Sequence, residues 1–167
     1  MDIRYFLIPL LIPVTICTSL HAQKSTDEKA ISAVIEQLFT GMRQGDSAMV
    51  HSVFSHQVTL ATISRGADGK SALTRETSIA AFLKSVGTPH PNAFNEEIWD
   101  LEISVDGEFA QVWCDYAFYV GNKFSHCGVD AFQLYHGSNG WKIFHLADTR
   151  RSSDCVIPKD VQRKHNQ

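Results

Sequence analysis

Residues 99–151 read WDLEISVDGEFAQVWCDYAFYVGNKFSHCGVDAFQLYHGSNGWKIFHLADTRR, and this stretch decides the fold. Apolar and polar residues alternate along much of it, which is typical of strands with one buried face. Turn signals divide the stretch at Asp106-Gly107, at the two-residue loop Gly121-Asn122 and at residues 137–140. We therefore expect a four-stranded antiparallel meander, in which each turn fixes the pairing of its two strands.

Helices are predicted in the N-terminal half. After a capping box at residues 25–28, apolar residues recur at helical spacing and form one stripe, which consists of Ile31, Val34, Ile35, Leu38, Phe39 and Met42. Gly45 ends this helix, and Asp46 is a suitable N-cap for a short second one. A strand follows, and Thr77 or Ser78 begins a third helix. The predicted fold class is α+β, with three N-terminal helices packed on a curved antiparallel sheet.

The first 22 residues have the order of a secretory signal peptide. Arg4 supplies a positive charge, an apolar segment follows over residues 5–16, and Ala22 marks the expected cleavage site. The apolar segment is shorter than a membrane span requires, so no membrane span is predicted. A lipoprotein signal with Cys17 as the lipidated residue is the alternative. Either way we expect a secreted, periplasmic or extracellular protein.

The remaining chain predicts one domain over residues 23–151 and a flexible C-terminal tail over residues 152–167. The formal net charge is −3, and the only basic cluster lies at the C-terminal end, so no nucleic-acid partner is predicted. Three cysteines remain after cleavage: Cys114, Cys127 and Cys155. An odd number leaves at least one of them unpaired within the chain, and the pairing stays open.

Strand register predicts a pocket on one face of the meander. Counting from the Gly121-Asn122 loop places Trp113 opposite Asp130 and Ala117 opposite His126. One face then collects five polar or aromatic residues, which are Trp113, Asp115, His126, Asp130 and His145. Apolar residues share this face, so we expect an apolar cavity with a few polar groups at one end, as small-molecule sites have.

Asp130 and His126 are the candidate catalytic residues of this pocket, with Asp130 as acid or base and His126 as its partner. If Asp115 and Asp130 are buried close together, repulsion and desolvation raise the pKa of at least one of them, which then exchanges protons near neutral pH. The candidate ligand-binding residues are Trp113, Asp115, Tyr119 and His145. Solvent-facing strand carboxylates and ordinary hydrogen-bonded histidines are the alternatives. No spacing matches a zinc motif, and neither a metal nor a cofactor is predicted.

The central strand, residues 109–120, is apolar on both faces. Such a sheet needs cover on both sides, and the helices cover only one. We therefore expect a homodimer through the outer sheet face. Cover by the C-terminal tail is the alternative.

Three sequence elements carry a family resemblance: FSHCGVDAF at residues 124–132, GWKI at 140–143 and DTRR at 148–151. With the order of elements, they make the chain similar to the nuclear transport factor 2-like superfamily over about residues 26–151. Within it, the chain resembles the exported bacterial proteins labelled putative lumazine-binding, close to the SnoaL-like polyketide cyclases. The resemblance implies a cone-shaped α+β fold, a dimer and a pocket between helices and sheet.

The resemblance implies no single reaction, because this fold hosts isomerases, dehydratases, cyclases and simple binding proteins. The leading hypothesis is an exported dimer whose pocket binds a small apolar or aromatic molecule. The alternative is an enzyme of the SnoaL or ketosteroid isomerase type that uses Asp130 and His126 as an acid/base pair on an apolar substrate. A third hypothesis is an interaction module that uses the tail and the sheet edge.

Overall fold

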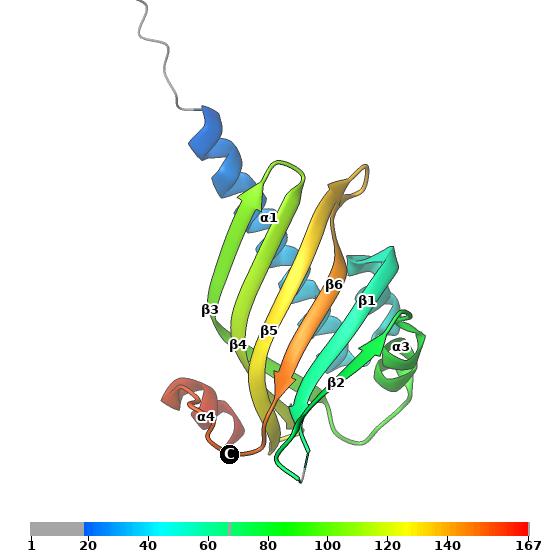
Figure 1. Cartoon of the computed structure of the whole chain (residues 1–167), viewed down its shortest axis with the longest axis vertical. Helices are drawn as coiled ribbons and strands as arrows, with labels where there is room; N and C mark the ends of the chain where they lie inside the picture. The colour runs from blue at the N-terminus through cyan, green and yellow to red at the C-terminus, as the bar shows by residue number, and fades with distance from the viewer. Residues whose placement is uncertain (1–18, 67, 167) are drawn as a thin grey trace, which may run out of the picture.

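The computed structural model describes residues 19–66 and 68–166 (Figure 1). In chain order the elements are α1 (Ser19–Gln44), α2 (Ser47–Val53), β1 (Phe54–Arg65), β2 (Ser71–Glu76), α3 (Ala80–Gly87), β3 (Phe94–Asp106), β4 (Phe109–Val120), β5 (Lys123–Gly137), β6 (Gly140–Arg150) and α4 (Lys159–His165). The predicted α+β class is confirmed, with β2 and α4 added. Within the described ranges, no helix has the length and apolar character that a membrane crossing needs.

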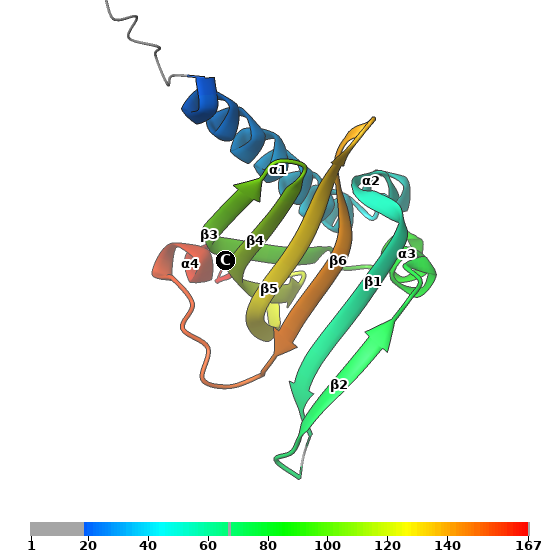
Figure 2. The ribbon, with the colours of Figure 1, turned by 45° about the horizontal axis from the view of Figure 1, so that its top comes forward.

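The six strands form one sheet in the order β2-β1-β6-β5-β4-β3, and only the β1–β6 pair is parallel. Both hairpin turns predicted around β5 are present, since Val120 pairs with Lys123 and Gly137 with Gly140. Helix α1 lies across one face of the sheet, with α2 and α3 near its C-terminal end (Figure 2). We call the face toward α1 the inner face and the opposite one the outer face.

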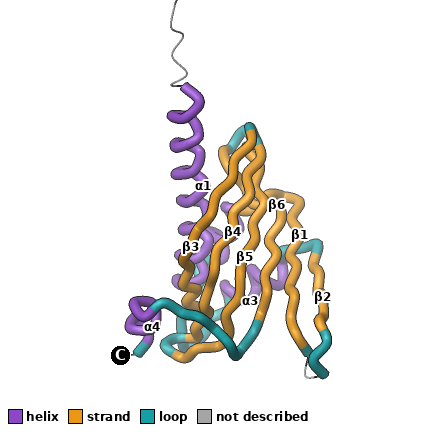
Figure 3. The backbone as a smooth tube through the Cα atoms, turned by 60° about the vertical axis from the view of Figure 1, so that its left-hand side comes forward, coloured by secondary structure: helices purple, strands orange, loops and turns teal. Residues whose placement is uncertain are grey.

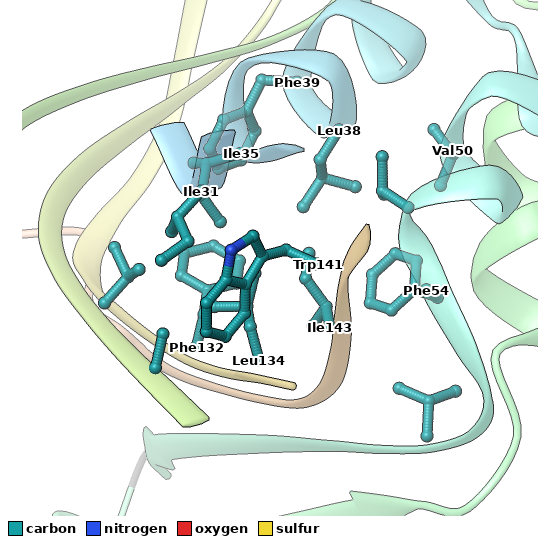
Figure 4. Close-up of a cluster of buried hydrophobic side chains, with 14 of the residues drawn as sticks. Ile31, Ile35, Leu38, Phe39, Val50, Phe54, Phe132, Leu134, Trp141 and Ile143 are labelled. Carbon is teal, nitrogen blue, oxygen red and sulfur yellow. The ribbon is translucent and has the colours of Figure 1, made fainter. Parts of the chain in front are cut away.

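The hydrophobic core lies between α1 and the inner face (Figure 4). The stripe predicted for the first helix is buried there, including Ile31, Ile35 and Leu38. Phe39 meets Phe132 of β5 edge to face, with ring centroids 6.3 Å apart. Each fully buried side chain of this kind contributes about 1.5–3 kcal/mol to stability. The core therefore holds α1 firmly against the strands that carry the site.

The ends of α1 agree only in part with the prediction. The helix begins at Ser19, so the capping box at residues 25–28 lies within it and not at its start. Its C-terminal end is as predicted, because Gly45 adopts a φ of +70°. The carboxylate of Asp46 then accepts a hydrogen bond from the backbone N–H of Met49 at 2.9 Å and caps α2.

Strand β2 was not predicted. It pairs antiparallel with β1, and all of its residues are exposed, so no alternation of burial marks it in the sequence. Because β2 runs to Glu76, helix α3 begins only at Ala80, with Ile79 as N-cap. Ser78, one of the two predicted caps, lies just before this start, and its Oγ accepts a hydrogen bond from the backbone N–H of Ala80 at 3.2 Å.

Three β-bulges change the register that the turns alone predict. Ser125 is the extra residue on β5, and beyond it His126 pairs with Phe118. Phe144 is the extra residue on β6, and β3 is irregular around Asp100, whose φ is +50°. Successive strand residues point to opposite faces, so one extra residue moves every later side chain across the sheet.

Residues 152–166 form an ordered arm, in place of the flexible tail that was predicted. A disulfide between Cys127 and Cys155 ties the arm to β5, and in the described chain Cys114 is left as a buried free thiol. Figure 3 shows the loop after β6 crossing in front of β5 and β4 to reach α4. Val161 of α4 packs into a second apolar cluster on the outer face. The tail therefore covers one end of that face.

Candidate functional site

A cavity of about 290 Å³ lies between the inner face of the sheet and helices α1 and α3. Its apolar wall consists of Leu38, Phe39, Met42, Leu60, Ala81, Phe82 and Leu146. Its polar lining consists of Thr62, Glu76, Glu96, Tyr116, His126, Asp130, Asp148 and Arg150. The helices thus supply only apolar groups, and every polar group comes from the sheet. In the part of the chain that is described, no three His, Cys, Asp or Glu side chains are grouped to hold a metal ion.

Asp130 and Glu96 form a pair of carboxyl groups at the polar end. Asp130 is only 3% exposed, Glu96 is half-buried, and the two share a hydrogen bond. Burial raises the pKa of Asp130 well above its usual range, and the charge of Glu96 raises it further. Burial also raises the pKa of Glu96, to about 7, although the hydrogen bond with Asp130 opposes this. Asp130 therefore keeps its proton and donates it to Glu96, which titrates near neutral pH.

A third carboxylate, Asp148, belongs to a separate hydrogen-bond network. Arg150 Nε donates to Asp148 Oδ2 at 2.6 Å, and Thr62 Oγ1 donates to Asp148 Oδ1, also at 2.6 Å. The hydroxyl of Tyr116 donates to the backbone carbonyl of Thr149 at 2.9 Å. Burial raises the pKa of Tyr116, so this hydroxyl stays protonated. Asp148 thus has a hydrogen-bonded cationic partner, whereas Arg150 acts on the Glu96–Asp130 pair only through its charge.

His126 lines the cavity, but no hydrogen bond among the described residues joins it to Asp130. Its Nδ1 lies 2.9 Å from Ser125 Oγ, and its ring packs against Phe118 and Tyr116. Burial lowers the pKa of His126, and the charge of Arg150 lowers it further, so the imidazole is neutral at pH 7. The carboxyl neighbour of Asp130 is Glu96, in place of a histidine.

The other predicted site residues lie on the outer face, and the prediction that all five polar residues share one face was wrong. Trp113 is 48% exposed there, and Asp115 is half-buried between Val129 and Trp99. Tyr119 stacks on His165 of α4, and His145 Nδ1 hydrogen-bonds to Thr59 Oγ1 at 2.6 Å. The bulges at Ser125 and Phe144 are the reason, because they turn His126, Asp130 and Asp148 inward while these four residues stay outside.

Sequence reasoning missed six of the polar lining residues: Thr62, Glu76, Glu96, Tyr116, Asp148 and Arg150. Asp148 and Arg150 did carry a signal, because both belong to the DTRR element that marks the family resemblance. The predicted register put Trp113 and Asp115 on the face of Asp130, and their alternation along the strand therefore put Tyr116 on the other face. Glu96 lies in a run of polar residues before the predicted start of its strand, and nothing in the local pattern marks it.

The architecture matches solved structures of the nuclear transport factor 2-like class. A protein of unknown function from Shewanella baltica is 20% identical with a TM-score of 0.58, and the match covers 77% of this chain and 97% of that chain. A protein with a cystatin-like fold from Novosphingobium aromaticivorans is 13% identical with a TM-score of 0.64, covering 92% and 99%. A putative dehydratase from Streptomyces avermitilis is 15% identical with a TM-score of 0.59, covering 78% and 99%. At these identities the likeness shows the fold alone, which is nuclear transport factor 2-like as predicted.

The sequence itself assigns the family. Residues 26–145 match the family described as "Putative lumazine-binding". The chain belongs to this family, and the resemblance given by its sequence elements is confirmed. No curated protein matches the sequence.

Proposed function

We propose that the protein binds a small, largely apolar molecule in the inner cavity, with the Glu96–Asp130 pair as its polar anchor. The observation that carries this proposal is the buried carboxyl group of Asp130, 3% exposed, at the polar end of a cavity whose helical wall is apolar. Burying a carboxyl group costs free energy, and small-molecule sites combine apolar walls with few convergent polar groups. The family description also names a small-molecule ligand.

Native mass spectrometry of the protein, purified without added ligand, tests this proposal. We expect a reproducible small-molecule adduct. Substitution Leu60→Trp fills the cavity from β1 and should remove the adduct. The matched substitution Ile63→Trp lies on the same strand but on the exposed outer side, and should leave the adduct in place. Equal adduct in both variants would place any ligand elsewhere and contradict the proposal.

A second candidate function is acid/base catalysis on the bound molecule. It is favoured by the pKa of Glu96, about 7, beside a protonated Asp130, because a pair with separated pKa values supplies both a base and an acid. An active pair should exchange the α protons of cyclohexanone for deuterium in D₂O, as followed by NMR. Glu96→Gln and Asp130→Asn should abolish the exchange, whereas Asp115→Asn on the outer face should not. Exchange no faster than in buffer would contradict the catalytic function, and only the binding function would remain.

We also propose a homodimer through the uncovered part of the outer face. An aromatic patch remains there, formed by Phe109, Trp113, Tyr135 and Phe144, of which the first three are 41–48% exposed. Exposed apolar patches of this kind mark interaction sites. Trp113→Glu should convert the dimer to a monomer in sedimentation-velocity experiments, whereas Leu73→Glu on β2 should not. A wild-type monomer at micromolar concentration would contradict the dimer.

Export is proposed on the basis of the N-terminal segment, most of which lies outside the described residues. The Cys127–Cys155 disulfide supports export, because disulfides persist mainly in oxidising compartments. N-terminal sequencing of protein from the extracytoplasmic fraction should begin at Gln23. Incorporation of labelled palmitate at Cys17 would favour the lipoprotein alternative, and an intact N-terminus in the cytosol would contradict export.

A further inference from the structure

The polar end of the cavity has an imbalance of charge. Among the described residues that line the cavity, four carry a carboxyl group, and only Arg150 is permanently cationic. Arg150 is already engaged, because its Nε lies 2.6 Å from Asp148 Oδ2 and its Nη2 3.5 Å from Asp148 Oδ1. The remaining acids of the buried end, Glu96 and Asp130, form no ion pair with a described residue, and the charge of Arg150 lowers their pKa values less than burial raises them.

Asp130 also has an unmet hydrogen-bonding capacity. Its Oδ2 is fully buried and receives no hydrogen bond from an N–H or O–H group of the described residues. The helices offer nothing to it, since α1 and α3 line the cavity only with apolar side chains. Buried polar atoms nearly always have a hydrogen-bond partner, so an unpartnered oxygen on a residue that lines a cavity points to a partner from outside the chain.

We propose that the occupant of the cavity is an organic monocation, a compound with one protonated amine on an apolar body, whose ammonium group binds between Glu96 and Asp130. This inference rests on the proposed binding function and gives its ligand class. Ammonium N–H groups would supply the donors that Asp130 Oδ2 lacks, and hydrogen bonds between charged groups are about twice as strong as neutral ones. The rings of Phe39 and Phe82 in the wall suit the apolar body and the charge beside it.

Proton balance gives the proposal a pH signature. Above the pKa of Glu96, about 7, the pair holds one proton and one negative charge, and an ammonium ion neutralises it without proton exchange. Below that pKa, Glu96 is protonated and must release its proton to solvent before the cation binds. Affinity should therefore rise about tenfold per pH unit up to about pH 7 and then level off. The other titratable groups facing the pair come from the sheet alone, and they are Glu76, Cys114, Tyr116, His126, Asp148 and Arg150.

Calorimetric titration with three probes of one hydrocarbon tests the ligand class: cyclohexylmethylamine, cyclohexylmethanol and cyclohexanecarboxylate. At pH 8 the amine should bind at least about tenfold more tightly than the alcohol, and the carboxylate should bind most weakly. An alcohol equal to the amine, or a carboxylate that binds best, would overturn the cation proposal while leaving the binding function intact. Absence of binding by all three probes would overturn the cation proposal. Together with the absence of a native adduct, it would also overturn the binding function.

Two variants locate the effect at the pair. Glu96→Gln should reduce the preference for amine over alcohol to less than about threefold and remove the pH dependence between pH 5 and 7. Asp115→Asn, an acid of the outer face, should retain both. Asp130→Asn should reduce the preference for amine over alcohol as Glu96→Gln does. If this buried variant does not fold, the wild-type probe series decides the question. A preference that survives Glu96→Gln unchanged would overturn the proposal.

Discussion

Glu96 and Glu97 are neighbours on β3, yet the two faces of the sheet shift their pKa values in opposite directions. Glu96 points into the inner cavity, where burial beside Asp130 raises its pKa to about 7. Glu97 points to the outer face, where burial also acts to raise its pKa, but Lys164 and His165 outweigh burial and lower it. The difference lies in the cations. The arm brings an ion-pair partner to Glu97 on the outer face, whereas the Glu96–Asp130 pair on the inner face forms no ion pair with a described residue.

The two faces of the sheet have different roles: the outer face packs against the arm, and the inner face lines the cavity. On the outer face, apolar and charged groups of the arm pack against β3, β4 and β5, which closes that end of the sheet. On the inner face, the helices approach with apolar residues alone and leave a cavity at the acids. Polar groups that have hydrogen-bond partners on the outer face stabilise the fold. Polar groups that lack such partners on the inner face are available to bind a ligand.

The largest effect is expected at Gly128 of β5, where neighbouring strands leave no room for a side chain. A Cβ atom at this position would overlap the backbone carbonyl of Thr149 and come within 2.8 Å of Tyr116 Cε1. Neither neighbour can move without breaking the Tyr116–Thr149 hydrogen bond. Gly128→Ala should therefore cost about 4 kcal/mol or more of unfolding free energy in urea titration. Gly66→Ala in an exposed loop is the control, and an equal small effect in both would show that β5 has room here.

Most of the fold could be predicted from the residues of its turns, whereas the bulges limited how much of the site could be predicted. The Gly121-Asn122 loop and the apolar stripe of the first helix gave the correct hairpin and core. A bulge such as that at Ser125 leaves no periodic signal, because only the packing of the finished sheet selects the extra residue. Asp130 and His126 were therefore found as residue types near a pocket, while their neighbours were assigned to the wrong face.

The arm on the outer face depends on the disulfide, and its removal should have the next largest effect. The double substitution Cys127→Ser and Cys155→Ser opens a link across a sequence separation of 28 residues. Such a loss costs about 3 kcal/mol through the greater freedom of the unfolded chain. We expect a lower midpoint in urea titration and faster proteolysis after Arg163 or Lys164. Unchanged proteolysis would show that α4 is held by packing alone, and would weaken the contrast between a covered and an open face.

The inner acids should make stability fall as pH rises. The pKa of Glu96 in the folded state, about 7, exceeds its ordinary value of 4.5, so the folded protein binds more protons between these pH values. Stability is therefore lost as pH rises from 4.5 to about 7. Because Glu96 is only half-buried, we expect Glu96→Gln to be about 2 kcal/mol more stable than wild type at pH 8, with little difference at pH 4. If the stability difference between Glu96→Gln and wild type were the same at pH 4 and pH 8, the pKa of Glu96 would not be raised in the folded state.

Glu97→Gln provides the matched test on the outer face, with the opposite sign and the smallest magnitude. Its folded pKa lies below its ordinary value, so its contribution is present at neutral pH and is lost as pH falls through the folded pKa. Lys164 donates to Glu97 Oε2 at 2.7 Å but is itself 57% exposed, so solvent and salt weaken the pair. We expect a loss of about 0.5–1 kcal/mol at pH 7 in low salt, shrinking in 1 M NaCl and at pH 3. If Glu97→Gln instead gained stability at pH 8, as expected for Glu96→Gln, the arm would supply no charge compensation and the two faces would not differ in this respect.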